Sequence, residues 1–77
     1  MNKKLIAKLI GMTRSDIEYI IDQRVICRHN AQRNREIFKL AYLDGISQER
    51  ISEKYGLTPR QVQNALYDTE RILLKHL

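Results

Sequence analysis

The chain has 77 residues, the length of a single domain, and its fourteen Lys and Arg against nine Asp and Glu give a net charge of +5. Its one cysteine, Cys27, excludes an internal disulfide and fits a reducing cytoplasm, in which we expect a buried, inert thiol. The sequence has no stretch typical of a secretory signal and no apolar run as long as a membrane span. These features favour one cytoplasmic domain over a disulfide scaffold or a membrane protein.

The excess positive charge lies in the N-terminal half of the chain. Residues 1–35 contain eight Lys and Arg against three Asp and Glu, whereas residues 36–77 contain six of each kind. A basic excess attracts polyanions through counterion release, whatever the sequence of the polyanion. A soluble protein can also be basic without such a partner, so the charge alone is weak support for nucleic-acid binding.

Apolar residues recur at helical spacing along the whole chain, and no segment alternates for long enough to predict a strand. We therefore predict a single all-α domain of about five helices, with a basic N-terminal helical hairpin over 1–30 and a tri-helical core over 31–77. The expected helices cover about residues 2–10, 13–28, 31–43, 47–55 and 59–77. A glycine follows the first, third and fourth of these, where a left-handed residue can end a helix.

The same periodicity selects the residues that should face the core. They are Leu5, Ile6, Leu9, Ile10, Ile17, Ile20, Ile21, Val25, Ile37, Leu40, Ala41, Ile51, Tyr55, Val62, Leu66, Ile72 or Leu73, and Leu77. Leucines 73, 74 and 77 exceed what one core face needs. They either form a subunit interface or belong to a last helix that closes the domain.

Residues 47–72 are the most informative stretch, because they have the spacing of a helix-turn-helix. A small residue at Ser52 lets a second helix cross closely, and Gly56 can take a sharp left-handed turn at little steric cost. A threonine and a proline then suit the start of the second helix. Its first apolar residue, Val62, can reach back into the core.

The exposed face of this second helix carries side chains that suit base edges and phosphates. Arg60, at the second helical position, can pair with guanine. The carboxamides of Gln61, Gln63 or Asn64 can pair with adenine, although each could equally lie on a solvated polar face. The predicted DNA-binding residues are these four, then Gln48, Lys54, Thr58 and Tyr67 as phosphate contacts, Pro59 between them, and Arg14 and Arg33 in the basic half. A half-buried packing role is the alternative for Tyr67.

Residues 34–74 resemble the promoter-reading C-terminal domain of bacterial sigma factors. The matching features are Arg35-Glu36-Ile37-Phe38, Tyr42-Leu43-Asp44-Gly45, Ser47-Gln48-Glu49 and Gly56-Leu57-Thr58. The stretch is also similar to the small enterobacterial regulators of fimbrial (adhesin) operons, which share a Tyr-Leu…Gly…Ser pattern and a Glu-Lys-Tyr segment before the turn. Both resemblances imply a tri-helical DNA-binding domain. No polymerase-binding sigma domain precedes this unit, so we expect a protein other than a sigma factor.

Residues 5–22 show an internal similarity to residues 50–67, to which they align with a constant offset of 45. Glycine aligns with glycine and threonine with threonine, so the first two helices could form a second helix-turn-helix. The simpler interpretation is that any short helix followed by glycine, a threonine cap and another helix gives such a match. We favour the simpler interpretation.

Other chemistry is not indicated. A zinc site needs more ligands than Cys27, His29 and the distant His76, so we predict no metal and no cofactor. No nucleophile stands beside a base and no glycine-rich phosphate loop is present, so we do not expect an enzyme. The lysines of the first helix could lie on a membrane surface, but we expect that helix to pack on the core, and no membrane partner.

The sequence thus predicts a cytoplasmic, nucleoid-associated transcription regulator of bacterial or phage-like type that binds duplex DNA. Because one recognition helix, over about 59–71, reads few base pairs, we expect a homodimer or higher homo-oligomer. The alternative is a protein-interaction module that docks on RNA polymerase or on another regulator. RNA binding is less favoured, because no aromatic stacking surface is visible.

Overall fold

The computed structural model describes residues 2–26 and 29–77, which fold into five helices and no strand, so the all-α prediction is confirmed. The helices are α1 (Lys3–Leu9), α2 (Arg14–Arg24), α3 (Ala31–Tyr42), α4 (Gln48–Tyr55) and α5 (Pro59–His76). The predicted buried thiol of Cys27 lies outside the described residues. Within the described part of the chain, no helix combines the length and apolarity needed to cross a membrane.

Side-chain caps set where four of the helices begin. Asn2, Thr13, Ser47 and Thr58 each precede a helix and accept a hydrogen bond from the backbone N–H three residues later. Such bonds satisfy one of the backbone donors that a helix leaves unpaired at its start. The exception is α3, where Asn30 takes a left-handed φ of 59° and makes no side-chain cap bond.

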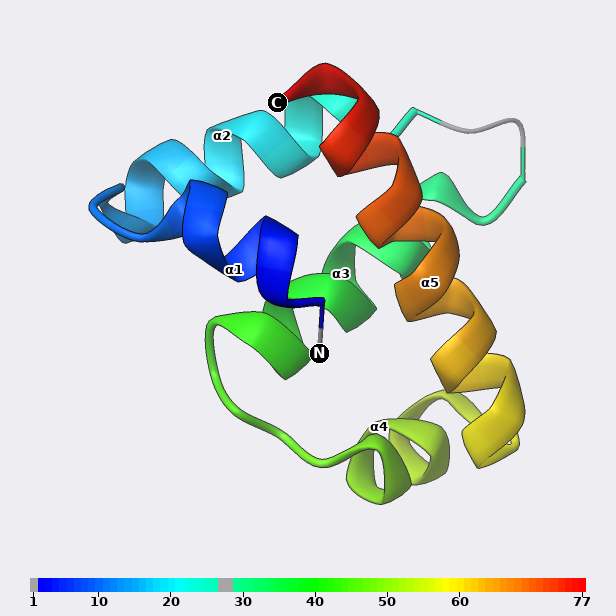
Figure 1. Ribbon diagram of the computed structural model, residues 1–77. Helices are drawn as coiled ribbons and strands as arrows, with labels where there is room; N and C mark the ends of the chain where they lie inside the picture. The colour runs from blue at the N-terminus through cyan, green and yellow to red at the C-terminus, as the bar shows by residue number, and fades with distance from the viewer. Residues whose placement is uncertain (1, 27–28) are drawn as a thin grey trace.

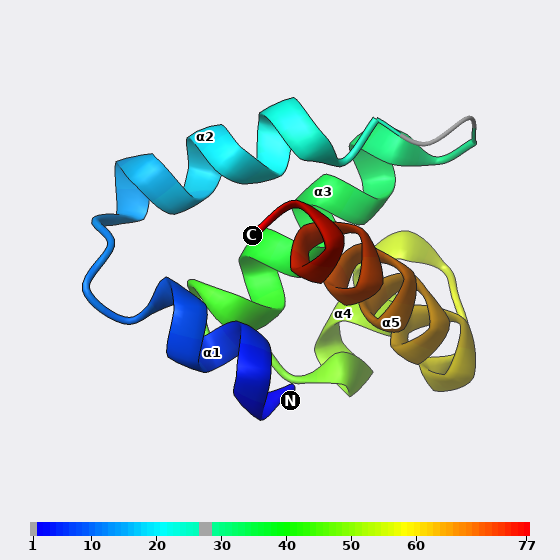
Figure 2. The same ribbon diagram turned by 45° about the horizontal axis from the view of Figure 1, so that its top comes forward.

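The longest helix, α5, is the centre of the fold. The other four helices all pack against it, α3 and α4 on one part of its length and α1 and α2 on another (Figures 1 and 2). The residues that α5 buries are Val62, Ala65, Leu66, Thr69, Glu70 and Leu73. Opposite them, Ile37 and Phe38 of α3 are fully buried, and the Phe38 ring stacks on Tyr42 with 4.1 Å between ring centroids.

Two predictions about the core need correction. Ile10 was expected to face inward, but its side chain is 74% exposed. The reason is that α1 ends at Leu9 and Ile10 has extended backbone, with φ −60° and ψ 131°, so its side chain no longer follows the helical face. Phe38 was not expected in the core and is fully buried, while Leu73 and not Ile72 is the buried residue near the end of α5.

The surplus leucines of α5 are used within the monomer. Leu73 is buried, and Leu74 and Leu77 are partly buried against the core, because α1 and α2 pack on α5 rather than chiefly on each other. At the end of α5, the Nζ atom of Lys8 donates a hydrogen bond to the backbone oxygen of Leu77 at 3.1 Å. The arrangement favours a closing role for these leucines over a subunit interface.

Polar contacts join α3 to α2, to α4 and to the residue before α1. Lys39 pairs with Asp22 at 2.8 Å, and the Tyr55 hydroxyl donates to a Glu36 carboxylate oxygen at 3.0 Å. The backbone N–H of Asn2 donates to the Tyr42 hydroxyl at 3.4 Å. Burial raises the pKa of Tyr42 to about 12; the Asn2 hydrogen bond opposes this shift and the Glu70 carboxylate adds to it.

Candidate nucleic-acid interface

The turn between α4 and α5 has the geometry that its sequence predicts. Gly56 is left-handed, with φ 66° and ψ 31°, and the backbone N–H groups of Gly56 and Leu57 both bond to the carbonyl of Ser52. Ser52 is 6% exposed, and its hydroxyl donates to the Glu49 carbonyl at 2.6 Å, so the small side chain is buried without an unpaired polar atom. With Val62 fully buried, α4 and α5 pack closely across the turn.

A reciprocal capping box begins α5. The Thr58 hydroxyl oxygen accepts from the Gln61 backbone N–H at 3.1 Å, and the Gln61 side-chain oxygen accepts from the Thr58 backbone N–H at 2.9 Å. Pro59 occupies the first helical position, where its missing N–H costs nothing. The cap engages the acceptor atom of Gln61, so the predicted two-point pairing of this residue with adenine would compete with the box.

On the rest of the predicted reading face, Arg60, Asn64 and Tyr67 are open to solvent and Gln63 is half-buried. Arg60 and Asn64 are exposed, and neither makes a hydrogen bond or ion pair with another described residue. Tyr67 is 58% exposed, and its hydroxyl accepts from the Gln63 side-chain amide at 2.9 Å, one helical turn away. Arg60 and Asn64 are therefore the two predicted base contacts whose polar atoms are fully available.

The start of α4 adjoins this face. Gln48, the first residue of α4, lines a hollow of about 300 Å³ together with Gln63 and Tyr67 of α5. Its exposed side chain thus lies beside the reading face, as a phosphate contact requires. Lys54 is exposed near the end of α4, with its ammonium 5.8 Å from the Tyr55 ring centre.

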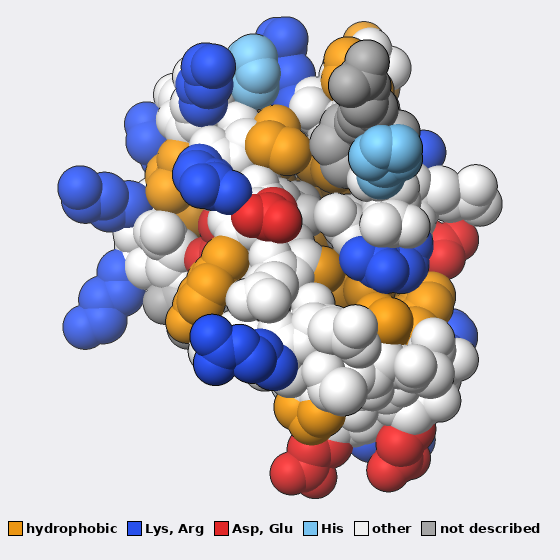
Figure 3. Space-filling model, turned by 90° about the vertical axis from the view of Figure 1, so that its right-hand side faces the viewer, with side chains coloured by type: hydrophobic (Ala, Val, Ile, Leu, Met, Phe, Trp, Pro, Cys, Tyr) orange, Lys and Arg blue, Asp and Glu red, His pale blue; other side chains and the backbone are white. Residues whose placement is uncertain are grey.

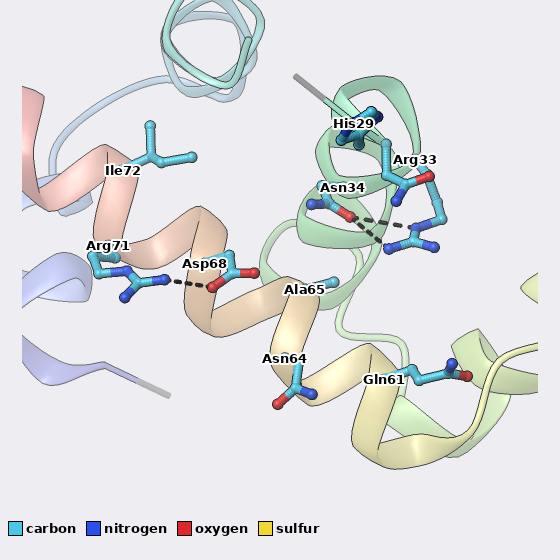
Figure 4. A pocket seen from close by; sticks show the side chains of 10 residues that line it. His29, Arg33, Asn34, Gln61, Asn64, Ala65, Asp68, Arg71 and Ile72 are labelled. Carbon is cyan, nitrogen blue, oxygen red and sulfur yellow. Dashed lines mark hydrogen bonds and ion pairs between the residues drawn. The ribbon is translucent and has the colours of Figure 1, made fainter. Parts of the chain in front are cut away.

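A second groove, of about 490 Å³, separates the start of α3 from α5 (Figure 4). Arg33 lines its α3 side and donates from Nε and Nη2 to the Asn34 side-chain oxygen at 3.4 and 3.3 Å. Asn64, Asp68 and Arg71 line the α5 side. The fold therefore brings Arg33 alongside the reading helix, although 27 residues separate it in sequence from Arg60.

Arg14 is not brought to the same place. It begins α2, and Figures 1 and 2 both show that end of α2 on the opposite side of the molecule from the start of α5. Its guanidinium pairs with Asp44 at 2.8 Å and with Glu18 at 3.7 Å. Its DNA contact stays a prediction, and one that this placement does not favour.

The groove also identifies residues that sequence reasoning missed. Arg71 is exposed and pairs with Asp68 at 2.6 Å, and both lie on the solvent face of α5 one to two turns beyond Asn64. The helical spacing 60, 64, 68 and 71 contained this signal, but the prediction ended at Tyr67. Asn34, buried on α3, had no comparable signal, because its position depends on the packing of α3 against α5.

No metal chemistry is visible at this site. Across residues 2–26 and 29–77, the His, Cys, Asp and Glu side chains form no group of three that could hold a metal ion. The arrangement instead offers hydrogen-bond donors and acceptors on an exposed helix, flanked by Arg33 of α3 and Gln48 of α4. Such a surface can bind nucleic acid or protein through hydrogen bonds and charge.

Comparison with known proteins agrees with this geometry. The family model for sigma-70, region 4 matches residues 31–73, just over half of the chain, from the first residue of α3 to the last turns of α5. No curated protein and no solved structure matches the chain. The family is one of helix-turn-helix DNA-binding domains without enzymatic activity, and its members bind DNA and RNA polymerase. The resemblance to the sigma-factor domain is thus confirmed, and the chain belongs to the sigma-70 region 4 family.

Proposed function

We propose that the protein is a sequence-specific regulator of transcription that places the first part of α5, about residues 59–71, in the major groove of duplex DNA. One observation carries the proposal. Arg60 and Asn64 stand exposed, with no side-chain partner among residues 2–26 and 29–77, at the start of the second helix of a helix-turn-helix from a DNA-binding family. The positive end of the helix dipole adds to the attraction for DNA at the same place.

The side chains divide into those that would contact bases, those that would contact phosphates and those that stabilise α5. Arg60 is suited to guanine O6 and N7, and Asn64 to adenine N6 and N7. Gln48 and Arg33 line hollows beside the reading face and would bind phosphate, which fixes orientation without reading sequence. Lys54 lines a separate hollow with Arg50, so its predicted phosphate contact is not part of this set. Thr58 holds the start of α5, and Gln63 holds the Tyr67 hydroxyl.

The protein would act through two copies. A single recognition helix reads only a few base pairs, and useful selectivity requires a second one about one helical turn of DNA away. Two half-sites about 34–36 Å apart, centre to centre, are therefore expected in the bound sequence.

A two-stage binding experiment tests the function. Random duplex DNA should shift in an electrophoretic assay at low salt and lose the shift as salt is raised. Selection from a random-sequence duplex pool should then yield a conserved motif. Salt-dependent binding with no enriched motif would refute the sequence-specific function, and no shift at low salt would refute DNA binding altogether.

A second candidate is docking on RNA polymerase, which domains of this family also bind. The exposed carboxylates of Glu49 and Glu53 favour it, because they put acidic charge on α4 beside the start of α5. Figure 3 shows Asp and Glu side chains at the lower end of the molecule, where Figure 1 places α4. Capture of purified core polymerase, lost on Glu49→Gln and Glu53→Gln substitution, would support this function.

A further inference from the structure

We propose that α1 and the C-terminal half of α5 form a second phosphate-binding surface, the α1–α5 cationic face, which holds the backbone of the same duplex outside the bases that α5 reads. The face is defined by Lys4, Lys8, Arg71 and Lys75. The inference rests on the proposed function and extends it beyond the family unit, because α1 lies outside the matched residues 31–73.

Contacts at both ends of α1 place it alongside α5. At its start, Asn2 lines a hollow of about 380 Å³ with Tyr67, Arg71 and Leu74. At its end, Lys8 bonds to the backbone oxygen of Leu77, the residue that follows α5. Lys4 precedes Lys8 by one helical turn, so the two side chains emerge from the same face of α1. Arg71 and Lys75 have the same spacing on α5, and both are exposed.

The charge of this face is nearly uniform. Figure 3 shows the side of the molecule on which α5 lies. Lys and Arg side chains gather over the upper and left parts of that side. Two carboxylates lie close by. Asp68 pairs with Arg71, and Glu70 is only 6% exposed beside the Tyr42 hydroxyl. An exposed ion pair such as Asp68–Arg71 contributes little, so Arg71 is free to turn to a phosphate.

Some of these cations also stabilise the C-terminal end of α5. A positive charge near a helix C-terminus stabilises the helix dipole, and Lys8, bound to the Leu77 carbonyl, does this directly. Lys4 and Lys75 make no hydrogen bond or ion pair with another described residue. They are therefore the two residues of the face whose replacement breaks no hydrogen bond or ion pair with a described residue.

Tyr67 joins this face to the reading face. It lines the hollow with Gln48 and Gln63, and also the hollow with Asn2 and Arg71, so one continuous surface runs from the start of α4 to α1. At 1.5 Å per residue, Lys75 lies roughly 22 Å along α5 from Arg60. The major groove is only about 12 Å wide, so when α5 enters it by its start and crosses it at an angle, the end of α5 lies over the flanking backbone.

The test is the salt dependence of binding to a random duplex by the double variant Lys4→Gln/Lys75→Gln. Each lost phosphate contact lowers the slope of log affinity against log salt by about 0.9, so the slope should fall by roughly two. Affinity should fall alike for all sequences. The matched control is Arg50→Gln, an exposed cation of α4 that lines a separate hollow with Leu40 and Lys54, away from the reading face, and its slope should equal that of the wild type.

The outcomes separate this inference from the proposed function. An unchanged slope in the double variant, with circular dichroism showing the native fold and the wild type still selecting a motif, would overturn the cationic face alone. Binding of the wild type, but not of the variant, to phosphatidylserine vesicles, with equal DNA slopes, would assign the face to a lipid surface and likewise overturn it. Absence of any salt-dependent DNA binding by the wild type would refute both proposals.

Discussion

Residues 5–22 and 50–67 are built alike at the level of the backbone. Each has a short helix, a glycine of positive φ and a threonine that accepts a hydrogen bond at 3.1 Å from the N–H three residues on. Their packing differs. Ser52 is buried where α4 meets α5, whereas its counterpart Ala7 is exposed on α1.

The consequence is that only one segment forms a helix-turn-helix. The helices α4 and α5 pack on each other, but α1 and α2 both pack on α5. The glycine and the capping threonine therefore determine how the chain turns, and the small buried residue determines whether the two helices cross. The family match covers 31–73 only, in agreement with this difference. The structure favours the simpler interpretation, in which the internal similarity does not indicate a second helix-turn-helix.

The largest expected effect comes from a substitution that disrupts the close packing of α4 against α5. Ser52→Leu should lower the free energy of unfolding by about 3 kcal/mol, because a leucine cannot fit where α4 and α5 approach. The counterpart Ala7→Leu should change it by about 0.5 kcal/mol or less, since that position is exposed. Urea unfolding of both variants measures the comparison, and equal losses would show that close approach at residue 52 is not what distinguishes the segments.

The next comparison concerns function. Arg60→Ala should weaken binding to the selected sequence by about 1–3 kcal/mol, through loss of a two-point contact with guanine. Arg14→Ala removes a cation that begins α2 and is paired with Asp44, on the opposite side of the molecule from the start of α5, and it should leave the sequence preference unchanged. Fluorescence anisotropy with matched and mismatched duplexes measures both. A loss of selectivity in Arg14→Ala would place α2 on the bases and revive a second reading unit.

The contrast between local turns and the packing of helices also explains how much of the fold the sequence could predict. Caps and turns are local, so Thr13, Ser47, Gly56 and Thr58 could be assigned from their neighbours, and the five helices with them. The solvent face of α5 followed from the buried position of Val62 through helical periodicity.

What could not be predicted depends on which helices meet. The groove between Arg33 and Arg71 exists because α3 packs across α5, and the same packing puts the buried Glu70 near the Tyr42 hydroxyl. The pairing of Arg14 with Asp44 likewise joins α2 to the end of α3. Gln61 was a different case: the capping-box spacing was present at residues 58 and 61, but the side chain was assigned to DNA instead.

A smaller effect separates the two threonine caps. Thr13→Ala and Thr58→Ala should each cost about 1 kcal/mol of stability, because each leaves a backbone N–H of the first helical turn without its acceptor. Only Thr58→Ala should also weaken DNA binding, since it loosens the start of the reading helix. Urea unfolding and duplex titration on the same preparations measure the two quantities. Equal loss of DNA affinity in both variants would indicate that the start of α2 also contacts the duplex.

The smallest effect sharpens the comparison at the glycines. Gly56, with φ 66° and ψ 31°, lies in the left-handed region, which costs ordinary residues about 1–2 kcal/mol but is tolerated by asparagine. Gly11, with φ 92°, lies beyond that region. A side-chain carbon would meet nothing within 4 Å at either glycine, so the backbone alone decides the cost.

Gly56→Asn should therefore destabilise the protein less than Gly56→Ala, by a margin of about 0.5–1 kcal/mol, whereas Gly11→Asn and Gly11→Ala should cost nearly the same. Thermal unfolding of the four variants measures the two margins. Equal margins at both positions would mean that the two turns share one backbone state and that the difference between the segments lies wholly in the packing of their helices. Because Gly56 faces open space, Gly56→Asn should also leave DNA binding intact, which separates the strain of the turn from the contacts of the reading face.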